Sequence, residues 1–117
     1  MNEWKIRLIQ ADVDVEDAIR RFVNKEDRYI KYLKMFGSGS DLHNFLVALD
    51  REDVAAAFDI CHTLKGVAGN LGFARVYQYS AEACEILRAG SMEGVRELVE
   101  AMKPNYDEIV EIINKYI

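Results

Sequence analysis

The residues best suited to chemistry lie in the segment 57–72, AFDICHTLKGVAGNLG. Four of them recur at three- and four-residue steps, so a helix places them on one face: His62, Lys65, Gly66 and Gly69. Near neutral pH much of a histidine side chain is uncharged, and one ring nitrogen then carries a free lone pair. That nitrogen can attack the phosphorus of an acyl phosphate and form a phosphoramidate. We therefore predict that His62 is an exposed nucleophile, with Lys65 offsetting the roughly two negative charges of a phosphoryl group.

The two glycines on this face are unusual for the interior of a helix. Each costs roughly 1 kcal/mol relative to alanine, so a helix that only had to be solvated there would use other residues. Because glycine lacks a side chain, Gly66 and Gly69 would let another surface approach the imidazole. We predict that both glycines serve partner access and docking.

The string HTLKG at residues 62–66, followed by Gly69 and by the pair Leu71-Gly72, resembles the signature of histidine-containing phosphotransfer (HPt) domains. The resemblance runs from about Val13 to the C-terminus. It implies a four-helix bundle whose exposed histidine relays a phosphoryl group between receiver-domain aspartates. Matched by position, His62 is the phosphorylated residue, Lys65 the neighbouring cation and Gly66 the small residue that admits the partner, while Gly72 closes the helix.

The resemblance also implies the partners, which are response-regulator receiver domains and a sensor (hybrid) histidine kinase. Three further polar residues are candidates for the docking surface: Asn70, Gln78 and Glu82. Many family members carry a polar residue near the position of Cys84 that helps to orient the site. Here a thiol stands between Glu82 and Glu85, so the residue that supports His62 from this helix stays open.

A long amphipathic helix must position His62. Its apolar face recurs at helical period and comprises Ala57, Ile60, Cys61, Leu64, Val67, Ala68 and Leu71. We expect Asp50 to cap the start of this helix, with Glu52 and Asp53 complementing its positive end, and Gly72 to end it.

Shorter helices are predicted before it. Residues 1–12 form an N-terminal arm, which the pattern leaves open between a strand-like arm, a helical turn and a packed leader. Asp14 is an N-cap for a short helix, and a second helix is expected over 26–36. The string GSGS at 37–40 is the clearest break, after which Ser40 caps the next helix.

Two helices are predicted after Gly72. The inner face of the first comprises Phe73, Val76, Ser80, Ala83, Cys84 and Leu87. Gly90 stops it, and we expect Ser91 to start the last helix, with a kink at Pro104. The fold class is therefore all-α: an antiparallel up-down four-helix bundle over 41–117 with short additional N-terminal helices, in a single HPt-like domain over 1–117.

Composition narrows the function classes. A net charge of −5 argues against nucleic acid and anionic membranes as partners. No apolar run approaches the roughly 20 residues of a membrane span, and we expect no signal peptide. Cys61 and Cys84 fall in apolar helical settings typical of reduced core residues, so we expect a monomeric, cytoplasmic protein. No cofactor and no metal site are expected, because both cysteines would point to the core, His62 outward, and His43 would be a surface residue.

The leading hypothesis is a phosphocarrier in a multistep, two-component phosphorelay, without its own ATP site and therefore not an enzyme. Two alternatives stay open. One is a non-catalytic helical adaptor that docks receiver domains. The other is an excised phosphoacceptor domain of a chemotaxis-type histidine kinase, whose donor would be ATP bound in a separate catalytic domain.

Overall fold

Helices joined by short connections account for most of the chain in the computed structural model, which describes residues 2–117. The helices are α1 (Glu3–Gln10), α2 (Val15–Arg21), α3 (Glu26–Gly37), α4 (Asp41–Asp50), α5 (Val54–Leu71), α6 (Ala74–Arg88) and α7 (Val95–Tyr116). Within residues 2–117 the β-structure is limited to one isolated antiparallel bridge between Val13 and Phe73. The predicted all-α fold is confirmed.

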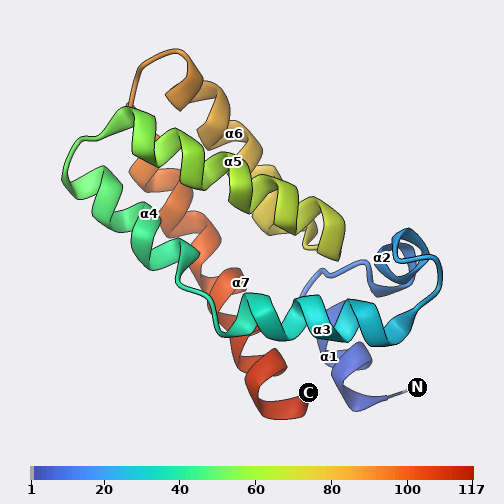
Figure 1. Ribbon diagram of the computed structural model, residues 1–117. Helices are drawn as coiled ribbons and strands as arrows, with labels where there is room; N and C mark the ends of the chain where they lie inside the picture. Colours follow the sequence, from blue (N-terminus) through green and yellow to red (C-terminus); the bar gives the residue numbers. More distant parts are fainter. Residues whose placement is uncertain (1) are drawn as a thin grey trace.

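Four helices, α4 to α7, form the antiparallel up-down bundle predicted from the sequence (Figure 1). Helix α5 packs between α4 and α6, and α6 packs in turn on α7. The connections are short, so each helix returns beside the one before it. The apolar seams predicted for α5 and α6 do face the core, where Leu64, Ala68 and Val76 are fully buried.

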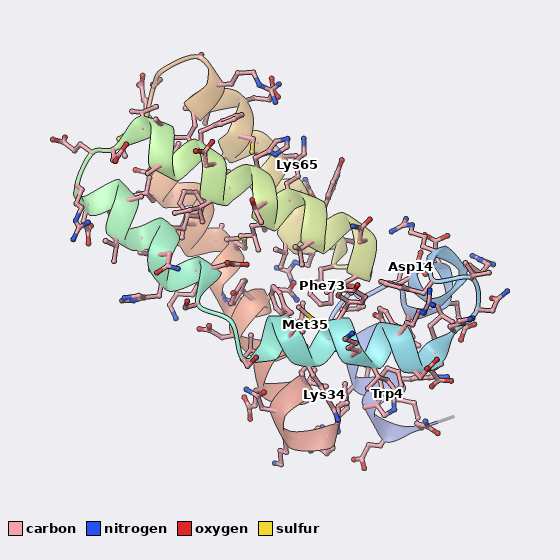
Figure 2. All side chains as sticks on the ribbon, viewed as in Figure 1. Trp4, Asp14, Lys34, Met35, Lys65 and Phe73 are labelled. Atoms are coloured by element: carbon pink, nitrogen blue, oxygen red, sulfur yellow. The ribbon has the colours of Figure 1, made fainter. Side chains whose placement is uncertain are left out.

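Helices α1 to α3 cover one end of this bundle, where α1 and α3 pack on α7 and α2 packs on α5 (Figure 1). An aromatic cluster joins them to it, because the ring of Phe36 in α3 lies 4.9 Å from Phe73 and 5.0 Å from Tyr106, between centroids. Figure 2 shows Phe73 between the end of α5 and helix α3. The core therefore runs without interruption from Trp4 in α1 to Ile113 in α7.

Most of the segment left open at the N-terminus is helix α1, over Glu3–Gln10, and Met1 lies outside the described residues. Trp4 and Leu8 are buried one turn apart on α1, whereas Ile6 and Ile9 are each 43% exposed. The prediction for α2 is confirmed, because the carboxylate of Asp14 accepts a hydrogen bond from the backbone N–H of Asp17.

Three predicted helix starts need correction. Asp50 is the last residue of α4, and Asp53 caps α5 instead by accepting a hydrogen bond from the N–H of Ala56. The chain turns between them at Glu52, whose φ is 54°. Helix α7 begins at Val95 after Gly94, because the hydroxyl of Ser91 caps only a local turn.

The third correction concerns Ser40, which precedes α4 as predicted but makes no side-chain cap hydrogen bond to its backbone. Helix α7 continues without a break through Pro104, as expected, and the kink there stays a prediction. No helix within residues 2–117 is both long enough and apolar enough to cross a membrane.

Candidate functional site

Helix α5 presents the predicted site face to solvent. Its inner side is buried, with Cys61 and Leu64 fully inaccessible. On the outer side His62 and Gly66 are exposed, while Lys65 and Gly69 are half-buried. The helical period read from the sequence thus separates a core face from a face that another molecule can reach.

The ring of His62 stacks on Phe58, one turn earlier in α5, with 5.7 Å between centroids and 28° between planes. The guanidinium group of Arg88, from α6, lies 5.5 Å from the centroid of the same Phe58 ring and forms an ion pair of 2.8 Å with Glu85. Within residues 2–117 the side chain of His62 makes no hydrogen bond and no ion pair. Its ring is therefore held by stacking alone, and neither ring nitrogen is occupied by a hydrogen bond within residues 2–117, so the nitrogen that carries the lone pair in the neutral ring is free to react.

Two charged residues flank His62 on α5. Lys65 lies one turn after it, on the side of α5 that faces away from α3 (Figure 2), and makes no ion pair with another residue of 2–117. Asp59 lies three residues before His62 and is exposed. The sequence analysis did not single out Asp59, Phe58 or Arg88. Asp59 and Phe58 stand three and four residues before His62, and this helical spacing could have identified them as its neighbours.

The two glycines on the site face differ in their surroundings. A Cβ atom added at Gly66 would meet nothing within 4 Å, so this position is open. A Cβ added at Gly69 would lie 3.3 Å from Cδ2 and 3.4 Å from Cε2 of Tyr77, at the start of α6. Gly69 therefore gives the Tyr77 ring room to lie against α5.

Position 84 does not support His62. Cys84 is fully buried beside Cys61, whose thiol donates a hydrogen bond to the carbonyl of Ser80 at 3.3 Å. Burial, together with the Cys84 thiol, raises the pKa of Cys61. Both cysteines are free thiols of the core, as predicted. Neighbouring Glu85 forms an ion pair with Arg88. The direct neighbour of the His62 ring is instead the aromatic ring of Phe58.

The remaining predicted docking residues lie on the surface. Asn70 is exposed near the end of α5, and Gln78 and Glu82 are exposed one turn apart on α6. None of the three hydrogen-bonds through its side chain to another residue of 2–117. Their part in docking stays a prediction. His43 is exposed on α4, as expected for a surface histidine.

The C-terminal end of α5 is capped by the N-terminal helices. Gly72 has φ of 80°, and a Cβ there would lie 2.6 Å from the carbonyl oxygen of Asp14, so only glycine fits. The last carbonyls of a helix lack partners within it. Here the hydroxyl of Tyr29 donates to the carbonyl of Leu71 at 2.9 Å, and the guanidinium of Arg21 donates to that of Gly69. Helices α2 and α3 thus fix the end of the site helix.

Within the part of the chain that the structure describes, no three His, Cys, Asp or Glu side chains gather in a metal-binding arrangement. The arrangement suits nucleophilic attack by an imidazole on a group presented from outside.

Comparison with known proteins bears on the same segment. Residues 37–112, which include α4, α5 and α6 and most of α7, match the family model described as Hpt domain. Neither a curated protein nor a solved structure matches the chain significantly.

Proposed function

The chain belongs to the Hpt domain family, and from this premise we propose that it carries a phosphoryl group on His62 between receiver-domain aspartates. Hpt domains act in histidine phosphotransfer within phosphorelays, and they are phosphocarriers rather than catalytic enzymes. The observation that carries the proposal is the exposure of His62 beside the open surface at Gly66, inside the matched segment.

The transfer step exchanges one bond to phosphorus for another. A neutral ring nitrogen of His62 attacks the phosphorus of a receiver's aspartyl phosphate, and an N–P bond forms as the P–O bond to the acyl group breaks. The aspartate leaves as a carboxylate, and the second transfer reverses these events with another receiver. The Mg²⁺ and the acidic pocket belong to the receiver, which presents the phosphoryl group to this chain.

Residues around His62 prepare it for this step. Phe58 holds the imidazole plane by stacking, which limits the orientations that the ring can adopt. Lys65 supplies positive charge one turn from the ring, which offsets the charge that arrives with the phosphoryl group. Gly66 leaves space for the receiver's surface.

The wider setting follows from the same proposal. The partners are receiver domains of response regulators and a hybrid sensor histidine kinase, and the carrier acts as a monomer in the cytoplasm. The chain from 1 to 117 forms one domain, which the continuous core from Trp4 to Ile113 supports.

Labelling from a phosphorylated receiver tests the proposal. A receiver domain is charged with radiolabelled phosphate, freed of donor and mixed with the wild type, His62→Gln or His43→Gln. The wild type and His43→Gln should take up label that is lost in acid and kept in base, as phosphohistidine is. His62→Gln should take up none, while its helical circular dichroism stays unchanged because the side chain is exposed. Label on His62→Gln would refute the assignment, and receiver binding without any label would favour the adaptor alternative.

A further inference from the structure

The structure assigns Tyr77 a role in docking: we propose that its ring, seated against Gly69, is the aromatic anchor for the acidic face of a receiver domain. This inference rests on the proposed function, because it concerns the surface around His62. It adds a residue of α6 to the surface around His62.

The seat of the ring is the backbone of α5. The edge of Tyr77 lies where a Cβ of residue 69 would be only 3.3 Å away, so an alanine there would press on the ring. Tyr77 nevertheless remains 44% exposed. The ring thus lies against the helix that carries His62 and remains partly exposed to solvent. A rigid, half-exposed tyrosine suits an interface anchor, since tyrosine offers large contact area with few torsions to freeze.

Exposed apolar side chains are unevenly distributed over the molecule. Within residues 2–117 the large hydrophobic side chains that remain exposed are Ile6, Ile9, Val23, Tyr32, Met35 and Tyr77. Five belong to the N-terminal 40 residues, so the four-helix bundle exposes only Tyr77. Tyr79, two residues on, is half-buried and packs against the core. The bundle therefore leaves one large aromatic ring uncovered, and this ring touches the site face.

The position of Tyr77 fits a shared footprint with His62. Gly69 follows His62 by two helical turns, which is about 10 Å along α5. A protein interface of ordinary size, about 800 Å² on each partner, covers both places. Lys65 and Gly66 lie between them on α5, and a Cβ added at Gly66 would meet nothing within 4 Å.

Charge identifies the partner's chemistry. Although the chain carries a net charge of −5, three cations surround this stretch of α5. Arg21 donates to the carbonyl of Gly69, Lys65 lies one turn after His62, and Arg88 covers Phe58. Two of these cations already have carboxylate partners, since Arg21 is paired with Asp17 and Arg88 with Glu85, and the exposed carboxylates of Asp59 and Glu82 also border this stretch. A receiver presents carboxylates around its phosphorylated aspartate, and these complement the ammonium group of Lys65, which of the three cations is the one without an ion pair within residues 2–117.

A pair of matched tyrosines tests the proposal. Tyr77 and Tyr32 are both 44% exposed, but Tyr32 lies on α3 and stacks on Phe22. Calorimetric titration with a receiver domain that labels wild-type His62 should give a dissociation constant for Tyr77→Ala about tenfold or more above the wild type. Tyr32→Ala should bind as the wild type does. Unchanged binding by Tyr77→Ala, or equal loss in both variants, overturns the proposal.

A second variant keeps Tyr77 and changes the residue of α5 against which its ring packs. Gly69→Ala should displace Tyr77 and weaken receiver binding severalfold, while Gly66→Ala, with nothing near its Cβ, should weaken it less. Gly69→Ala with wild-type affinity would overturn the seating of the anchor even if Tyr77→Ala misfolds. The proposed function and the anchor can fail separately. If the wild type takes no label on His62 from any receiver, the carrier role is wrong. If the wild type is labelled and Tyr77→Ala binds the receiver normally, only the role of Tyr77 as an anchor is refuted.

Discussion

Replacing Gly66 by alanine should stabilise the protein, whereas the same change at Gly69 should not. In a solvated helix interior this substitution gains roughly 0.4–1 kcal/mol, through better helix propensity and a less flexible unfolded chain. The full gain is available at Gly66, because an added Cβ meets nothing within 4 Å. At Gly69 the contact of 3.3 Å with Tyr77 requires the ring to shift by a few tenths of an ångström, which offsets the gain.

Thermal and urea unfolding followed by circular dichroism measure this difference. A gain of 1 kcal/mol corresponds to a rise in melting temperature of about 4 °C for a chain of this size, so Gly66→Ala should melt about 2–4 °C higher. Gly69→Ala should melt at or below the wild-type temperature. The two glycines lie one turn apart in the same helix, so each serves as the control for the other.

A larger side chain at position 66 should lower phosphotransfer without lowering stability. Gly66→Gln should be at least as stable as the wild type, yet accept phosphate from a receiver much more slowly, since its side chain stands one turn from His62. Small donors such as phosphoramidate, which need no docking, should be affected far less. A Gly66→Gln protein destabilised by more than about 2 kcal/mol would refute the reasoning, because it would place Gly66 in a tight helix–helix contact.

Three further changes test other parts of the structure. Lys65→Ala should slow the transfer step in rapid-quench kinetics far more than it weakens receiver binding. Transfer rates equal to those of the wild type across salt concentrations would show that Lys65 is only a solvated surface charge. Tyr29→Phe should lower the free energy of unfolding in urea by about 1–2 kcal/mol, because the buried carbonyl of Leu71 loses its donor. Since burial raises the pKa of Tyr29, the fold favours its neutral form, so wild-type stability should fall above about pH 10 and more steeply than that of Tyr29→Phe. Cys61 and Cys84 are both buried, and the pKa of Cys61 is raised. A thiol reagent should therefore react with neither cysteine until urea unfolds the chain. Rapid reaction of the native protein would contradict this packing.

The sequence predicted the bundle and the exposure of His62 because both depend on a local period. Ala57, Cys61, Leu64 and Ala68 recur on one side of α5, and this spacing alone directs His62 to the other side. The prediction that Gly72 ends α5 also depended on local sequence alone. A helix commonly ends at a residue with left-handed backbone conformation, and glycine is the residue that most readily adopts it.

Features that depend on tertiary contacts were less accessible. Arg88 contacts Phe58 from the next helix, and no spacing in the sequence predicts that contact. Asp50 and Asp53 are both good helix caps by residue type, and the turn at Glu52 between them decided the outcome. The difference between the open Gly66 and the occupied Gly69 also required the position of Tyr77 on α6.

The most direct test of the carrier role is to observe the phosphorylated ring itself. The chain contains two histidines, so the imidazole region of a proton–nitrogen correlation spectrum holds only two sets of signals, from His43 and His62. After charging with a catalytic amount of receiver and excess acetyl phosphate, we predict a phosphorus resonance coupled to one ring nitrogen of His62 and unchanged His43 signals. Coupling to His43, or phosphate held by a carboxylate and lost in base, would contradict the assignment of His62 as the phosphoryl carrier.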